Sequence, residues 1–98
     1  MVKVITELTD IPQEGAVIID FFATWCGPCK RIAPVYEELA KKYGKVTFLK
    51  VDVDEAEEIA SKFSVESLPT FVFLKNGVKV KRIEGADPRA LINQLEGM

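Results

Sequence analysis

The hydrophobic positions of this chain form short apolar runs that alternate with segments of helical periodicity. Residues 16–23 read Ala-Val-Ile-Ile-Asp-Phe-Phe-Ala, with Asp20 as the only charged residue of the run. A short run of this kind is typical of a central parallel strand that is buried on both faces. Similar but more mixed runs predict four further strands, at residues 2–6, 46–53, 70–74 and 78–83.

The segment 28–43 has the pattern of an amphipathic helix, because its apolar residues recur every three or four positions. The residues of this stripe are Ile32, Val35, Tyr36, Leu39, Ala40 and Tyr43. Pro34 lies inside the segment and predicts a kink, because proline removes one backbone hydrogen bond. Gly44 predicts the end of the helix.

Two shorter helices are predicted from their start signals. Asp54 followed by Glu57 predicts a capping box, with a buried stripe made of Ala56, Ile59, Ala60 and Phe63. Asp87 followed by Pro88 predicts the start of the last helix, with Leu91, Ile92 and Leu95 facing inward.

The order of these elements predicts one α/β domain over residues 1–98. Strands and helices alternate along most of the chain, and the last two strands are joined by Asn76-Gly77, a strong hairpin signal. Residues 7–15 predict at most a turn of helix. The expected architecture is a mixed sheet flanked by helices on both faces.

Composition narrows the possible chemistry. The chain has 98 residues, of which 48% are hydrophobic, and a net charge of −2, which gives no basic face for nucleic acid. No apolar run is long enough for a membrane span, and the chain opens as a strand and not as a secretory signal. There is no histidine, which excludes Cys–His and Ser–His hydrolases. Two cysteines are too few for a structural zinc site within one chain.

The two cysteines stand where a buried strand passes into a helix, in the stretch Trp25-Cys26-Gly27-Pro28-Cys29-Lys30. Free backbone N–H groups and the positive end of the helix dipole stabilise a thiolate at this place, so we expect a lowered pKa for Cys26. Two intervening residues let the second sulfur reach the first. Cys26 is then able to attack a disulfide, and Cys29 to resolve the mixed disulfide.

Other interpretations of the pair are two buried core cysteines, or half of a zinc site shared between two chains. A C-x-x-C motif by itself supports each of them. The strand–helix context favours the redox interpretation, which requires no metal or organic cofactor.

Charged residues elsewhere have simpler interpretations. The acidic run Asp52, Asp54, Glu55, Glu57 and Glu58 lacks the pattern of a calcium loop and predicts a strand end followed by a solvated helix start. A second set is predicted to face solvent from an edge hairpin: Lys75, Lys79, Lys81 and Arg82.

The cysteine motif and several later segments resemble the thioredoxin family. The similarity covers residues 20–34 as one block with the sequence Trp-Cys-Gly-Pro-Cys-Lys at its centre. It continues through residues 51–54, 68–71, 75–77 and 85–86 in the family's order and spacing. The connection between the first two strands is shorter than usual, so we expect a reduced first helix.

The resemblance implies a four- or five-stranded mixed sheet and a role for each matching residue. Cys26 is the implied nucleophile and Cys29 the implied resolving cysteine. Pro69 matches the family's cis-proline, which lies against the cysteine pair. The residues implied to contact the substrate are Trp25, Gly27, Pro28, Leu68, Pro69, Gly85 and Ala86.

Asp20 and Lys50 have two interpretations each. Burying a lone carboxylate is costly, so Asp20 either faces water at a strand end or has a raised pKa. The resemblance implies that Asp20 accepts the proton of Cys29 and that Lys50 is its partner. The alternative for Lys50 is an edge lysine that opposes aggregation.

The resemblance implies a protein-disulfide reductase. We expect it in the cytoplasm, with a monomer as the default oligomeric state. The resemblance also implies a thioredoxin reductase as electron donor and oxidised proteins as clients, because Gly-Pro between the cysteines is similar to the reducing members. The alternative function is a binding module that holds a partner protein on a redox-switchable surface around the cysteine pair.

Overall fold

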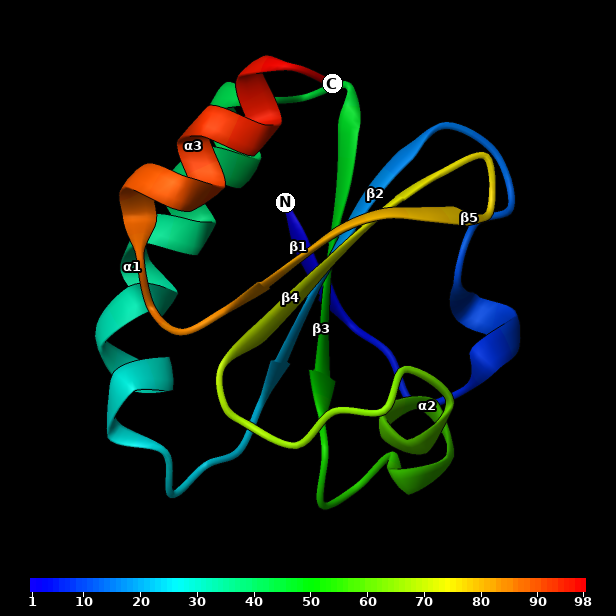
Figure 1. The fold of residues 1–98 in the computed structure, drawn as a ribbon, viewed down its shortest axis with the longest axis vertical. Helices are drawn as coiled ribbons and strands as arrows, with labels where there is room; N and C mark the ends of the chain where they lie inside the picture. The colour runs from blue at the N-terminus through cyan, green and yellow to red at the C-terminus, as the bar shows by residue number, and fades with distance from the viewer.

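The computed structural model describes all residues from 1 to 98, and they form a five-stranded sheet with helices on both faces (Figure 1). The elements in chain order are β1 (Val2–Val4), the 3₁₀ turn η1 (Leu8–Asp10), β2 (Ala16–Phe22), α1 (Gly27–Lys42), β3 (Val46–Asp52), α2 (Glu57–Lys62), β4 (Thr70–Lys75), β5 (Val78–Glu84) and α3 (Pro88–Glu96). The strand order is β1-β3-β2-β4-β5.

Strand β2 occupies the centre of this sheet. Residues 17–21 are all buried, because β2 has a neighbour on each side and helices cover both faces. The prediction of a central buried strand is confirmed. Its neighbours differ, since β2 is parallel to β3 but antiparallel to β4.

Two apolar clusters pack on the two faces of the sheet. Ile18 belongs to the cluster beneath α1 and α3, which lie side by side in Figure 1. Val17 and Ile19 belong to the cluster on the other face, with Ile59 of α2. Alternate residues of one strand therefore anchor both layers of helices.

Three predictions from local sequence signals are confirmed. Asp87 caps α3 by accepting hydrogen bonds from the backbone N–H groups of Arg89 and Ala90. Asn76 and Gly77 both have positive φ, at 51° and 82°, as the two-residue hairpin requires. The connection between β1 and β2 holds only the single turn η1.

The predicted capping box of the second helix is wrong. Helix α2 begins at Glu57, its N-cap residue is Ala56, and no side chain caps it. The carboxylate of Asp54 accepts a hydrogen bond from the Trp25 indole instead. The carbonyl of Asp52 accepts from the N–H groups of Glu55 and Ala56, so a turn separates Asp54 from the helix.

The prediction that the charged hairpin residues face solvent is wrong at one position, Arg82. Lys75, Lys79 and Lys81 are exposed, as predicted. Arg82 is half-buried, because its guanidinium bonds to backbone carbonyls beyond α2. Charge alone predicted solvent for all four, but the chain that follows α2 offers Arg82 an acceptor pair.

Tyr36 joins α1 to the sheet and provides a test of the packing. Its buried hydroxyl lies 2.7 Å from the carbonyl oxygen of Leu49 and 3.2 Å from that of Ile18. We expect Tyr36→Phe to lower the free energy of unfolding by about 1–2 kcal/mol, because a buried hydrogen bond is lost. Urea unfolding measures this.

The matched control is Tyr43→Phe. Its hydroxyl bonds to Glu96 at the surface, so its loss is expected to change stability by less than about 0.5 kcal/mol. Equal stabilities of the two variants would contradict the importance of the buried hydroxyl.

Candidate active site

The two cysteines lie where β2 passes into α1. Cys26 is the N-cap residue of α1, with φ −85° and ψ 111°, and Pro28 and Cys29 lie in the first turn. The N–H of Cys26 donates to the carbonyl of Ala23 at 3.2 Å, which fixes the turn after the strand. Proline is tolerated in a first helical turn because the N–H it lacks has no partner within the helix.

Cys26 and Cys29 are joined by a disulfide, with their Cα atoms 5.3 Å apart. The backbone N–H of Cys29 donates to Cys26 Sγ at 3.2 Å. Both residues are buried, at 5% and 4% exposure, in a small cluster with Ala23. A donor aimed at Cys26 Sγ from the helix start would also stabilise negative charge on that sulfur.

Trp25 is exposed, directly before Cys26, and it is hydrogen-bonded to the loop that follows β3. The residue is 70% exposed, and its Nε1–H donates to Asp54 Oδ2 at 2.9 Å. The N–H of Asp54 in turn donates to Asp52 Oδ1. Sequence reasoning missed this role of Asp54. The available signal was the parallel register, which pairs Phe22 with Asp52 and brings the loops after β2 and β3 together.

A third segment, the chain before β4, lies against the cysteine cluster. The Leu68-Pro69 bond is cis, as the resemblance implied for Pro69, and Leu68 packs against the cluster of Ala23, Cys26 and Cys29. The Pro69 carbonyl accepts the N–H of Gly85 at 2.9 Å.

Gly85 and Ala86 complete the edge of the site. Gly85 has a φ of +105°, which side-chain-bearing residues rarely adopt. Ala86 is exposed and lines a hollow with Arg31 and Ile32 of α1. Gly27 is also exposed, and Pro28 is half-buried. The fold thus gathers the predicted contact residues at one end of the sheet.

Asp20 is buried in the strand that leads to the cysteines. It is 1% exposed, and its Oδ1 has no hydrogen-bond partner in the protein. Burial raises the pKa of Asp20 from 3.8 to about 7, although the charge of Lys50 acts to lower it. The interpretation of Asp20 as a water-facing strand-end residue is therefore wrong.

Lys50 pairs with Asp20 in the register of β2 and β3. Strand β3 lies between β1 and β2, so the interpretation of Lys50 as an edge lysine is also wrong. Its Nζ lies 4.5 Å from the centre of the Phe22 ring. Lys50 and Cys29 both line a hollow of about 240 Å³.

No group of three or more His, Cys, Asp or Glu side chains is arranged to hold a metal ion. None of the helices combines the length and apolar content that a membrane crossing needs.

Comparison with known proteins agrees with the geometry. The thioredoxin family model matches residues 5–97. Thioredoxin 1 of Plasmodium falciparum is 50% identical, over 98% of this chain and 96% of its own length. Thioredoxin-1 of Schizosaccharomyces pombe is 45% identical, over 93% and 92% of the two chains.

Solved structures give the same result. A Plasmodium falciparum thioredoxin superposes with a TM-score of 0.91 at 48% identity and covers 97% of each chain. A Malassezia sympodialis thioredoxin has a TM-score of 0.92 at 46% identity and covers 99% of this chain and 90% of its own. The chain therefore belongs to the thioredoxin family, and its redox-active pair Cys26–Cys29 makes it a protein-disulfide reductase.

Proposed function

We propose that this reductase works in the cytoplasm as a monomer, takes electrons from a thioredoxin reductase and passes them to oxidised client proteins. The observation that carries the reducing role is the Cys26–Cys29 pair at the start of α1, with Gly27-Pro28 between the sulfurs. A reducing role suits a compartment that keeps thiols reduced.

The reaction proceeds in two exchanges. The Cys26 thiolate attacks one sulfur of the client disulfide, and the other client sulfur leaves as a thiolate. The Cys29 thiol then loses its proton, and its sulfur attacks Cys26 Sγ. The second client sulfur leaves, and the Cys26–Cys29 disulfide remains, as in this structure. Two electrons pass from the pair to the client.

Asp20 is the group we assign to accept the proton of Cys29. An acid–base group works best when its pKa lies near the working pH, and the pKa of Asp20 is about 7. Lys50 and Cys29 share one hollow, and Lys50 pairs with Asp20 in the sheet. Asp20 does not line this hollow itself, so Lys50 is the residue that links the carboxylate in the strand to the hollow at Cys29.

The client docks on the surface around the pair. Trp25 offers an exposed apolar face, and Leu68 offers the backbone before the cis bond, against which an extended client segment lies. The small residues Gly85 and Ala86 leave room for that segment. Gly27 and Pro28 present the turn that carries Cys26.

The redox potential of the pair is the first test. Equilibration against glutathione and dithiothreitol buffers, with trapping of free thiols, gives the potential. We expect a value below about −260 mV, since such a dithiol stays reducing against a glutathione pool at about −220 to −260 mV. A value above about −200 mV would indicate a disulfide donor or isomerase.

The second prediction concerns Asp20→Asn. We expect slower release of the client thiol, by about tenfold or more at pH 7, because the proton acceptor of Cys29 is lost. Stopped-flow kinetics with a peptide disulfide measures the rate. The matched control is Glu14→Gln, which removes an exposed carboxylate. Unchanged kinetics in Asp20→Asn would contradict the assignment.

Asp20→Asn is expected to slow the reaction but to stabilise the fold at high pH. Because the folded pKa is raised, the native state holds its proton more tightly than the unfolded chain, and stability falls as pH rises from about 4 to 7. The rise from 3.8 to about 7 corresponds to a penalty on the order of 4 kcal/mol above pH 7. Asp20→Asn is therefore expected to stabilise the protein at pH 8 but not at pH 3, as denaturant unfolding at both pH values would measure.

A further prediction uses the single tryptophan of the chain as a fluorescent probe. In Asp54→Ala the indole loses its hydrogen bond, so we expect lower fluorescence anisotropy of Trp25. The rate of client reduction should fall about threefold, the effect of roughly 0.6 kcal/mol of lost positioning. Glu55→Ala, which removes a neighbouring exposed carboxylate, is the control. Equal anisotropy in both variants would count against the role of Asp54.

A further inference from the structure

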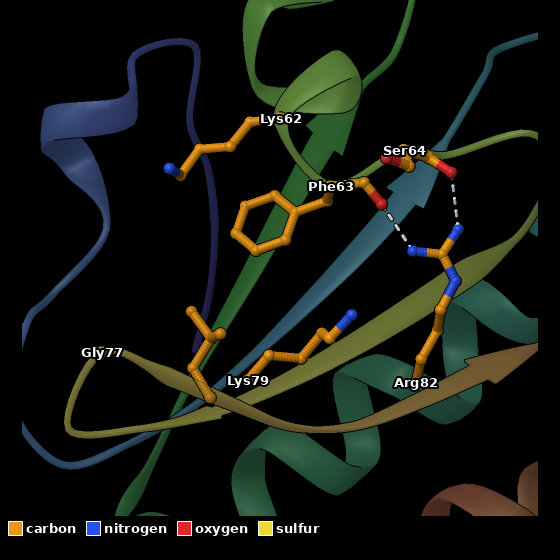
Figure 2. A pocket seen from close by; sticks show the side chains of 7 residues that line it. Lys62, Phe63, Ser64, Gly77, Lys79 and Arg82 are labelled. Carbon is orange, nitrogen blue, oxygen red and sulfur yellow. Dashed lines mark hydrogen bonds between the residues drawn. The ribbon is translucent and has the colours of Figure 1, made fainter.

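Arg82 turns back onto the protein from β5, while its neighbours Lys79 and Lys81 are exposed. Its side chain is only 22% exposed. Nη1 donates to the carbonyl oxygen of Phe63 at 2.5 Å, and Nη2 donates to that of Ser64 at 2.8 Å (Figure 2). The third donor, Nε, pairs with Glu84 Oε2 at 3.0 Å. Every branch of the guanidinium therefore has a defined partner.

The two carbonyls belong to the chain that leaves α2. The last carbonyls of a helix have no partner within it, and Ser64 takes a left-handed conformation, with φ at 52°. A planar guanidinium suits two adjacent acceptors better than a lysine ammonium does. A hollow of about 330 Å³ lies between the end of α2 and the start of β5, and Arg82 spans one side of it.

The chain beyond Ser64 leads directly into the docking edge of the site. Residues 66–68 make no backbone–backbone hydrogen bonds. On one side of this stretch Arg82 binds the carbonyls of Phe63 and Ser64, and on the other the N–H of Gly85 donates to the Pro69 carbonyl. The N–H of Val65 also donates to the Ala60 carbonyl, and the Thr70 hydroxyl donates to the Ser67 carbonyl at 2.6 Å. Arg82 lies in β5 and Gly85 directly follows it, so β5 and the residue after it bind both ends of the segment.

We propose that Arg82 is a positioning residue for client recognition: its fork onto Phe63 and Ser64 sets where the Leu68–Pro69 backbone lies against the cysteine pair. The inference rests on the proposed docking of clients at Leu68. Arg82 touches neither the sulfurs nor the client. Its effect is therefore confined to substrates that bind along the Leu68 backbone, and it leaves the intrinsic chemistry of the pair unchanged.

The test compares two substrates of different size. In Arg82→Met we expect the second-order rate with a peptide disulfide to fall about fivefold, the effect of about 1 kcal/mol from the lost hydrogen bonds. The fall should appear as a higher half-saturation concentration and not as a lower maximal rate. The rate with Ellman's reagent, a small disulfide that needs no backbone docking, and the redox potential of the pair should stay at wild-type values.

Three further variants sharpen the comparison. Lys81→Met removes an exposed cation from the same strand and should behave as wild type with both substrates. Arg82→Lys keeps the charge but not the fork, and should recover less than half of the loss. Glu84→Gln weakens only the contact at Nε, and should shift the peptide rate about twofold in the same direction. If Arg82→Met does not fold, the last two variants carry the test.

Two results would overturn the proposal. A wild-type peptide rate in folded Arg82→Met would leave Arg82 with a structural role only. An equal fall with the peptide and with Ellman's reagent would place its effect on the cysteines. Failure of the wild-type protein to reduce the peptide disulfide would contradict the proposed docking instead, so the two ideas fail separately.

Discussion

Burial of β2 on both faces is the constraint on which the rest of the structure depends. Ile18 packs beneath α1 and α3, and Val17 and Ile19 pack on the side of α2, so one strand holds both layers of the fold together. The chain leaves this strand at Phe22 and reaches Cys26 within four residues. Because the site lies at the end of a strand that is buried on both faces, the core fixes its position.

The same constraint creates the titrating group of the site. Asp20 lies within the buried run, and its desolvation raises its pKa to about 7. A carboxylate at a strand end would have stayed ionised at this pH. Burial of Asp20 thus lowers the stability of the fold but provides a group that binds a proton near neutral pH. The charge of Lys50 makes the rise in pKa smaller.

Strand direction explains why the site gathers at one end of the sheet. The register pairs Phe21 near the end of β2 with Thr70 at the start of β4, and Thr70 with Glu84 at the end of β5. The cysteine turn, the cis-proline bond and Gly85 therefore meet although they are far apart in the chain. The parallel pairing of β2 with β3 adds the loop of Asp54 to the same end.

The sequence by itself determined the features whose causes lie within a few residues. Periodicity, turn chemistry and capping are local, so the sequence predicted the features that depend on them. These are the α/β fold, the central strand, the Asn76-Gly77 hairpin, the Asp87 cap and the place of the cysteine pair. The resemblance to known proteins predicted the cis bond before Pro69 and the membership of the family. Only the tertiary structure decided the hydrogen-bond partners of Asp54 and Arg82. Asp54 lies 29 residues from Trp25 in the chain, and Arg82 lies 19 residues from Phe63. Local rules assigned Asp54 to a helix cap and Arg82 to solvent. The physical reason is that a charged side chain takes the best partner that the packed register brings within reach, and that register is fixed by the whole sheet.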